Sequence, residues 1–403
     1  MTEKLNILVK ADAHGQSIAV EEDGRLAEYY REDTAGDSLV NAVFLGKVDR
    51  VMKGLEAVFV KIGQPRSGFL PIKEMESFEA TAGGTAFLSG GELIVQVKKD
   101  AKGEKGAYLS RDVALPGQYV VFMPYNRFVG VSERIEDEQQ RAELSALGKK
   151  LTEGKCGLVL RSAAAQQSEG TLQGELQTLQ ARWQAILEKA EHAKAPELLY
   201  REESMLSMLV RDYAPRYELR ITCNDRVNRM PASPAGLLWE QIDVEAMDAL
   251  WAKHAIEEQL RTALGRTVAL KSGGSLIIDE REALTTIDVN SGSFNPRADA
   301  AFQLNLKACE EIAAQIRLRN LSGILLIDFI DMETDEQRAQ VAQALQQGLL
   351  RERQKTVIHG FTSLGILEMT RKRMGVSLRD MLKVPCSVCG GTGYQRKGNK
   401  TLA

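Results

Sequence analysis

The 403-residue sequence lacks the features that mark secreted and membrane-spanning proteins. It contains no stretch of twenty apolar residues, so no segment is long enough to cross a bilayer as a helix. Residues 1–15 lack a basic region followed by an apolar region and a small-residue cleavage site, so no secretory signal is expected. These absences predict a soluble protein that resides in the cytoplasm.

Cysteine and histidine are also scarce. The five cysteines form an odd number with a single close pair, Cys386 and Cys389, which fits a reducing compartment better than a disulfide framework. The four histidines are scattered, at positions 14, 192, 254 and 359. This distribution argues against a mechanism that depends on paired imidazoles or on a histidine-centred triad.

The charge is nearly balanced overall but uneven along the chain. A net charge of −3 and a pI near 6.0 argue, on average, against a nucleic-acid-binding protein. Residues 371–400, however, contain eight lysines or arginines and one acid, and residues 97–106 contain four lysines. Such patches suit contacts with phosphates. For either patch alone, ordinary solvated surface charge remains an equally good explanation.

The length is enough for about two to four domains, and 44% hydrophobic beside 27% charged residues is ordinary globular composition. Strands are predicted over residues 6–9 and 17–21, followed by a polar stretch that ends near Asp37. From Leu39 to Ile72, short apolar runs separated by glycines predict a small β-barrel. Helical spacing or composition predicts helices over 136–150, 171–190, 202–213 and 246–264, and a short buried strand is predicted within 157–165.

Two phenylalanines are predicted on the outside of this barrel. Alternate residues of a strand face opposite sides, and the aliphatic residues of 56–62 form one face, so Phe59 lies on the other face beside Lys61. The same alternation places Leu70 inward and Phe69 outward. Exposed aromatic rings beside basic residues suit base stacking by single-stranded nucleic acid. The alternative is that both rings are ordinary core aromatics.

The most informative segment is 273–332, which predicts a hairpin, a helix and a buried strand. The hairpin strands are predicted over 275–279 and 283–289, the helix over 299–318, and the last strand is a continuous apolar run that ends at Asp328. A strand, a helix and a second strand in this order form a βαβ unit, whose parallel strands end at the same edge of the sheet. Asp288 and Asp328 are therefore predicted to emerge side by side.

Two carboxylates held this close repel each other unless one is protonated or a cation neutralises them. Oxygen ligands favour Mg²⁺ or Mn²⁺, and such an ion can orient a phosphodiester and activate water. Asn290 lies two residues beyond Asp288, hence on the same face, where its amide can hold that carboxylate in place. The alternative is that Asp288 and Asp328 only end their strands and cap the helices that follow.

The close pair Cys386 and Cys389 has the spacing of two zinc thiolates on a tight, glycine-rich turn. A structural zinc needs four ligands, and the chain has no second pair of this kind, so a complete site requires a second copy of the chain. The pair therefore predicts a homodimer that shares a structural Zn²⁺. A redox-active pair is the alternative, but it is expected to begin a helix, which the glycines at 390, 391 and 393 disfavour.

These motifs resemble those of the ribonuclease E/G family of endoribonucleases. The resemblance rests on TTIDVNSG (285–292), ILLIDFIDM (324–332), LGILEMTRKR (364–373) and the turn CSVCGGTG (386–393), and it extends over most of the chain. It implies a Mg²⁺-dependent enzyme that cleaves single-stranded RNA in RNA processing and decay, including rRNA maturation. Hydrolysis of the phosphodiester is expected to leave 5′-phosphate and 3′-hydroxyl ends.

The resemblance also implies a multidomain α/β and β fold with particular site residues. The expected parts are an RNase H-like domain in two segments (1–38 and 199–270), an S1-type OB barrel (39–112), a 5′-sensor region (113–198), a DNase I-like catalytic α/β domain (271–383), and a zinc-link with a basic tail (384–403). The family's site residues fall on Asp288, Asp328 and Asn290 for catalysis and Mg²⁺, Cys386 and Cys389 for zinc, Phe59, Phe69 and Lys105 for RNA, and Gly117, Val121, Arg161 and Ser162 for a 5′-monophosphate.

Three departures from the family qualify these expectations. Ser162 stands where threonine is usual, and the loop after Asn290 is shorter than usual. The sequence ends ten residues after Gly393, without the small domain that pairs dimers into tetramers, so a dimer is expected rather than a tetramer. No segment for recruiting degradosome partners is expected either. The alternative function is that of a non-catalytic RNA-binding protein that uses the S1 barrel as a clamp.

Overall fold

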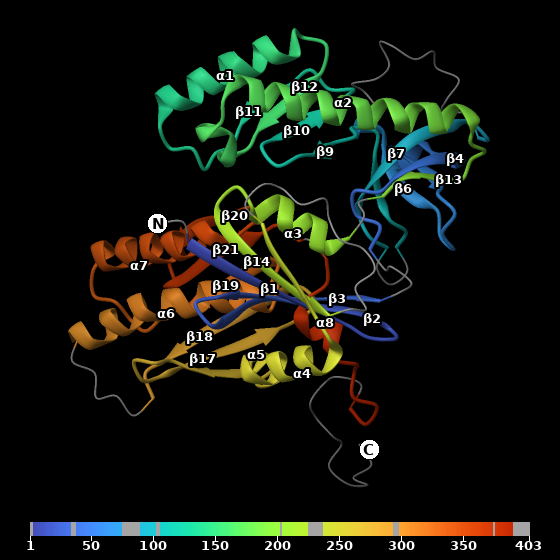
Figure 1. Ribbon diagram of the computed structural model, residues 1–403. Helices are drawn as coiled ribbons and strands as arrows, with labels where there is room; N and C mark the ends of the chain where they lie inside the picture. Colours follow the sequence, from blue (N-terminus) through green and yellow to red (C-terminus); the bar gives the residue numbers. More distant parts are fainter. Residues whose placement is uncertain are drawn as a thin grey trace, which may run out of the picture. The chain divides into compact units, whose positions relative to one another are not determined.

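The computed structural model describes residues 3–33, 38–74, 89–101, 105–201, 204–224, 237–292, 298–373 and 375–389. The protein is a mixed α/β structure with several separate sheets (Figure 1). The chain forms two compact units: the first contains residues 1–7, 11–16 and 32–242, and the second contains 8–10, 17–31 and 243–403. Across the described residues, no helix is both long enough and apolar enough to span a membrane.

The first unit contains the predicted β-barrel. Its strands are β4 (Val43–Met52), β5 (Ala57–Lys61), β6 (Gly68–Pro71), β7 (Glu92–Lys99) and β8 (Tyr108–Ser110), in the order β4-β5-β6-β8-β7, and pairing of β4 with β7 closes the barrel. The structure confirms the predicted faces: Val60 and Leu70 are fully buried, whereas Phe59 and Phe69 are half-buried. A further strand, β13 (Glu197–Tyr200), pairs with β4.

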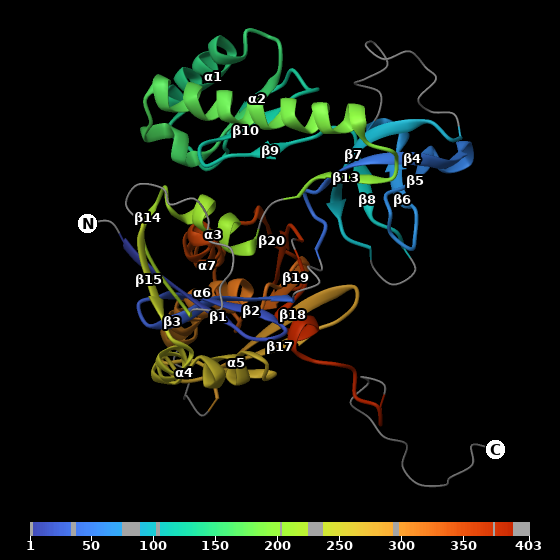
Figure 2. The ribbon, with the colours of Figure 1, turned by 45° about the vertical axis from the view of Figure 1, so that its right-hand side comes forward.

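A second, smaller sheet of the first unit carries two helices. Its strands are β9 (Leu115–Pro116), β10 (Val120–Met123), β11 (Val129–Val131) and β12 (Gly157–Leu160), in the order β11-β12-β10-β9. Helices α1 (Glu138–Thr152) and α2 (Glu169–His192) share one hydrophobic core with it. In Figure 2, α2 extends along β10 and β9 toward β13. Side-chain caps from Asp137 and Ser168 set where both helices begin.

A five-stranded sheet has the order β15-β14-β1-β2-β3. Its strands are β1 (Glu3–Ala11), β2 (Gly15–Glu22), β3 (Arg25–Asp33), β14 (Tyr217–Asn224) and β15 (Leu238–Ile242), and α3 (Met205–Tyr213) precedes β14. The sequence pattern predicts β1 and β2, but for the residues after β2 it indicates only a polar stretch without a strand. That interpretation was wrong for β3, whose glutamate Glu28 is buried and paired with arginines from far along the chain.

The long segment of the second unit, residues 243–403, starts with two short helices, α4 (Val244–Lys253) and α5 (Ile256–Ala263). The sequence predicted one helix over 246–264. The helix is instead interrupted at Ala255, whose φ of 48° lies in the left-handed region. A residue in that conformation cannot continue a right-handed helix. The remaining short helices in the described residues are the 3₁₀ segments Lys53–Leu55, Ile72–Glu74, Ser162–Gln166 and Leu349–Arg351 and the α-helix α8 (Leu378–Leu382).

The main sheet of the second unit contains the predicted βαβ unit. Its strands are β16 (Thr267–Ala269), β17 (Ser275–Glu280), β18 (Leu284–Asn290), β19 (Gly323–Asp328), β20 (Thr356–Phe361) and β21 (Ile366–Arg371), in the order β16-β17-β18-β19-β21-β20. Helix α6 (Ala298–Leu318) connects β18 to β19, which run parallel. Helix α6 and helix α7 (Asp335–Gly348) share the sheet's hydrophobic core.

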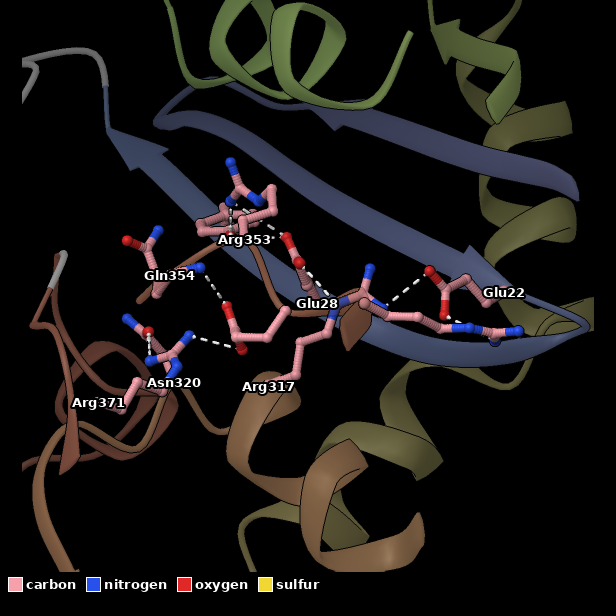
Figure 3. Close-up of polar contacts among 10 residues, drawn as sticks. Glu22, Glu28, Arg317, Asn320, Arg353, Gln354 and Arg371 are labelled. Carbon is pink, nitrogen blue, oxygen red and sulfur yellow. Dashed lines mark hydrogen bonds and ion pairs between the residues drawn. The ribbon is translucent and has the colours of Figure 1, made fainter. Parts of the chain in front are cut away.

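A buried group of charged side chains joins β2 and β3 to the rest of this unit (Figure 3). We call Glu22, Glu28, Arg317 and Arg353 the arginine–glutamate cluster. Arg317 donates from Nε to Glu28 Oε1 at 2.7 Å and from Nη1 to Glu22 Oε1 at 2.8 Å, and Arg353 donates to Glu28 Oε2 at 3.2 Å. The hydroxyl of Tyr30 also donates to Glu28, at 2.7 Å. Because Glu28 and Arg317 are 4% and 7% exposed, these charges depend on one another for stabilisation.

Candidate functional site

The two aspartates of the predicted site lie on neighbouring parallel strands. Asp288 on β18 and Asp328 at the end of β19 are direct partners in the register, as are Ile287 and Ile327 one position earlier. Both isoleucines are fully buried in the core, so the aspartates point away from the core, on the opposite face of the sheet. Asp288 is half-buried and Asp328 is exposed. The adjacency predicted from the βαβ order is confirmed.

Asn290 contacts the first of these aspartates directly. Its Nδ2 donates a hydrogen bond of 2.7 Å to Asp288 Oδ2, the contact that the two-residue spacing predicted. Asn290 therefore binds one oxygen of the Asp288 carboxylate, Oδ2, and not the other, Oδ1. Gly274, on the neighbouring chain segment, has a φ of +81°, and a Cβ there would lie 2.4 Å from Asn290 O. Glycine at this position therefore lets the backbone approach the end of β18 closely.

The carboxylate oxygens at the carboxyl ends of β18 and β19 are suitable ligands for a hard divalent cation. Within the ranges that the structure describes, no group of three or more histidine, cysteine, aspartate or glutamate side chains could hold a metal ion. The protein thus offers a carboxylate pair, Asp288 and Asp328, rather than a closed cage. Mg²⁺ commonly binds through one or two carboxylates and completes its octahedron with water and substrate phosphates. Two adjacent carboxylates at an open sheet edge match that requirement, and Mn²⁺ shares it.

The predicted RNA-contacting phenylalanines are cross-strand partners on the barrel. Phe59 and Phe69 pair in the register of β5 and β6, and their ring centroids are 5.9 Å apart at an interplanar angle of 72°. The guanidinium carbon of Arg50 lies 4.6 Å from the Phe59 centroid, so a cation accompanies the rings. Lys105 is exposed and comes shortly before β8. The arrangement presents aromatic faces and positive charge on one outer surface of the barrel.

The structure brings the predicted 5′-sensor residues together on the small sheet. Arg161 follows β12 and donates from Nη1 to Gly117 O at 2.7 Å, and Val121 on β10 pairs with Val159 of β12. The second guanidinium nitrogen, Nη2, donates to Asp212 Oδ1 at 2.8 Å. The hydroxyl of Ser162 accepts a short hydrogen bond from Arg216. Asp212 and Arg216 were not predicted from the sequence, because they lie about fifty residues away on α3 and just before β14.

Glu175 on α2 fixes the loop that contains Gly117. Its carboxylate accepts hydrogen bonds from three consecutive backbone N–H groups, those of residues 118, 119 and 120, at 2.5, 2.8 and 2.9 Å. A Cβ on Gly117 would lie 2.6 Å from the carboxylate carbon, so a larger residue there would force the Glu175 carboxylate to shift. Burial, and secondly the Glu175 charge, raise the pKa of Tyr119. No local sequence pattern distinguishes Glu175 from the other polar residues of α2.

The cysteines differ in their exposure. Cys386 is exposed and Cys389 half-buried, shortly after α8, whereas the thiols of Cys156, Cys223 and Cys309 are buried. Burial raises the pKa of the Cys309 thiol to about 12, which makes that side chain unreactive. All five cysteines lie in described segments, and none forms a disulfide. Cys386 and Cys389 are therefore the most accessible thiols of the chain.

The fold and the site define an α/β protein that combines a β-barrel with an aspartate pair at a sheet edge. A family model described as the ribonuclease E/G family matches residues 114–374. Ribonuclease G of Haemophilus influenzae is 34% identical over 410 residues, covering 96% of this chain and 84% of the relative. Ribonuclease G of Escherichia coli strain K12 is 34% identical over 408 residues, covering 96% and 83%. Ribonuclease E of Nostoc sp. is 34% identical over 405 residues, covering 94% and 59%.

The chain belongs to the ribonuclease E/G family. The family model spans β9 to the end of β21, and so includes both aspartates and the residues predicted to form the 5′ sensor. The similarity to the curated relatives covers the barrel as well, because it extends over nearly the whole chain.

Proposed function

We propose that this protein is a Mg²⁺-dependent endoribonuclease that cleaves single-stranded RNA in the cytoplasm, in rRNA maturation and RNA decay. The observation that carries the proposal is the in-register pair Asp288 and Asp328, with Asn290 donating to the first. The names of the relatives, ribonuclease G and ribonuclease E, support the same activity. Mn²⁺ is the alternative metal, since it accepts the same oxygen ligands.

In this proposal, Asp288 and Asp328 would hold the cation, and Asn290, through its hydrogen bond to Asp288, would keep that carboxylate in position. When bound, Mg²⁺ supplies Lewis acidity that stabilises charge on the phosphodiester and lowers the pKa of the attacking water. Water oxygen bonds to phosphorus, the bond from phosphorus to the 3′ oxygen breaks, and that oxygen takes a proton. The products are a 5′-phosphate and a 3′-hydroxyl. The rigid sheet keeps both carboxylates in position before substrate arrives.

RNA binding is assigned to the barrel, which we interpret as an S1-type OB domain. Phe59 and Phe69 provide rings for base stacking, and Lys105 provides charge for a phosphate. The remaining parts follow the family architecture: an RNase H-like domain from 1–38 and 199–270, and a DNase I-like catalytic domain over 271–383. These assignments rest on the family resemblance and agree with the presence of a closed barrel and separate α/β sheets.

A 5′-monophosphate pocket is assigned to Gly117, Val121, Arg161 and Ser162. The guanidinium of Arg161 is held by Gly117 O and by the Asp212 carboxylate, both oxygen acceptors. A terminal phosphate is a stronger, bidentate acceptor for the same fork of N–H groups, so RNA binding exchanges the Asp212 contact for the phosphate. The hydroxyl of Ser162 supplies a further donor at this position.

The decisive experiment is a cleavage assay on a 5′-labelled, unstructured RNA. We expect cleavage in Mg²⁺, its loss in EDTA, and its return when excess Mg²⁺ is added, because the carboxylate pair needs the cation. A matched substrate with a 5′-hydroxyl should be cut more slowly than one with a 5′-monophosphate. Binding of RNA without cleavage in Mg²⁺ would instead support the alternative, a non-catalytic RNA-binding protein.

The zinc-link proposal gives a separate prediction. Cys386 and Cys389 supply two thiolates, and the same pair from a second chain completes a Cys₄ zinc site. Cys386→Ser is therefore expected to convert dimers to monomers in size-exclusion chromatography and to remove the bound zinc, about one ion per two chains. The control is Val388→Ala, an exposed residue between the two cysteines, which should leave the dimer intact. A dimer that persists in Cys386→Ser would refute the shared site.

A further inference from the structure

A single row of side chains crosses five strands of the barrel. The register pairs Arg50 on β4 with Phe59 on β5, Phe59 with Phe69 on β6, Phe69 with Tyr108 on β8, and Tyr108 with Lys99 on β7. We call these five residues the aromatic row. It has three rings in the middle and one cation at each end. Sequence reasoning found only two of its rings, because β8 is three residues long and gives no clear alternation.

The rings are evenly spaced and lie on the outer surface. The centroids of Phe69 and Tyr108 are 6.0 Å apart, nearly the same as the 5.9 Å between Phe59 and Phe69. The ammonium of Lys99 lies 5.5 Å from the Tyr108 centroid, which mirrors Arg50 over Phe59 at 4.6 Å. Tyr108, the first residue of β8, is half-buried like the two phenylalanines, and it lies between the buried residues Ala107 and Leu109. Its ring therefore faces the same way as theirs.

The backbone is built to bring Tyr108 beside Phe69. The amide of Phe69 donates to Ala107 O at 2.7 Å, which joins β6 to the start of β8. A Cβ on Gly106 would lie 2.1 Å from Ser67 O, so only glycine allows the two segments to come this close. The Tyr108 phenol lies near the Glu74 carboxylate, and burial, followed by the Glu74 charge, raises the pKa of that phenol. The backbone pairing and the contacts with Phe69 and Lys99 thus place the Tyr108 ring beside Phe69 before any ligand binds.

We propose that Tyr108 is a third base-stacking residue, so that the aromatic row binds three successive bases of single-stranded RNA while Arg50 and Lys99 contact phosphates at its two ends. The proposal rests on the proposed RNA-binding role of Phe59 and Phe69 and extends it. Aromatic rings accept any base, since every base has a π-face, and neighbouring cations neutralise the backbone. The three neighbouring rings can stack on successive bases of an extended RNA chain. The cations at the two ends of the row can contact phosphates of the same chain.

The test is fluorescence anisotropy with a labelled, unstructured ten-nucleotide RNA, in buffer without divalent ions so that no cleavage occurs. Tyr108→Ala is expected to weaken binding about 5- to 100-fold, the range for losing one stacked base, and Tyr108→Phe to stay within about twofold of wild type. Tyr108→Leu, which keeps an apolar side chain over the barrel, should weaken binding as Tyr108→Ala does. The matched control is Tyr200→Ala: Tyr200 also lies beneath a basic side chain, that of Arg182, but is outside the row.

A second probe separates stacking from structural support. With an abasic chain of the same length, the affinities of wild type and Tyr108→Ala should be equal, because no base remains to stack. An equal loss on both probes would overturn the stacking role. If Phe69→Ala weakens RNA binding and the Tyr108 variants do not, the third ring is refuted and the proposed binding face stands. If none of these variants weakens binding, the proposed binding face itself fails.

Discussion

Replacing Asp328 with asparagine is expected to lower the rate of RNA cleavage by about 10³-fold or more, with RNA affinity unchanged within about twofold. Asparagine keeps the size of the side chain but removes the negative charge that pairs with a divalent cation. Because Asp328 is exposed and ends its strand, the change leaves no buried charge unpaired. Asp288→Asn should have the same effect. Single-turnover cleavage of a labelled RNA and anisotropy without divalent ions measure the two quantities.

Two further variants test whether the loss of RNA cleavage is caused by impaired metal binding. Asn290→Ala removes only the hydrogen bond that orients Asp288, so the rate should fall about 10- to 100-fold and the Mg²⁺ concentration for half-maximal activity should rise. Asp335→Asn is the control, since that side chain is 93% exposed on the first turn of α7 and should leave cleavage unchanged. Wild-type activity in Asp328→Asn would exclude it as a metal ligand and remove the basis of the proposed function.

Glu28→Gln is expected to lower the free energy of unfolding by about 3 to 5 kcal/mol. Glu28 accepts from Arg317, Arg353 and Tyr30, and it is 4% exposed, so its charge compensates two guanidinium groups that have little access to water. Glutamine fills the same space without that charge, which leaves positive charge buried and partly uncompensated. Urea denaturation followed by circular dichroism measures the change.

The matched control for this variant is Glu258→Gln in the same unit. Glu258 also pairs with an arginine, Arg261 at 3.9 Å, but their side chains are 71% and 79% exposed. An exposed pair of this kind contributes about 0 to 1 kcal/mol, so the control should unfold close to wild type. Equal effects in the two variants would show that the arginine–glutamate cluster adds nothing beyond an ordinary surface pair.

The elements around the aspartate pair could be predicted because their signals are local. The run up to Asp328 is continuously apolar, helix α6 has a clear period, and the hairpin has a charged turn, so order and register followed from adjacent residues. The outward position of Phe59 likewise followed from the alternation within one strand. Where one strand or one helix carries the whole pattern, the sequence is sufficient to place the side chain.

The features that were missed depend on contacts between distant segments. Strand β3 has the sequence RLAEYYRED, which lacks a clear alternation of polar and apolar residues, and only its pairing with Arg317 and Arg353 explains why Glu28 is buried. The surroundings of Arg161 could not be predicted for the same reason, because Asp212 comes from another element. The break at Ala255 has no glycine or proline to signal it, and it depends on a left-handed conformation adopted by one alanine. Tertiary contacts override local preference at such positions.

The arginine–glutamate cluster also bears on how the chain folds while it is being made. Glu22 and Glu28 are synthesised long before Arg317, which follows them by 295 and 289 residues. At about 5 to 20 residues per second, the ribosome takes roughly 15 to 60 s to cover that distance. During this interval strands β2 and β3 carry carboxylates whose arginine partners have not yet been synthesised. Completion of the second unit therefore waits until helix α6, which carries Arg317, has been synthesised.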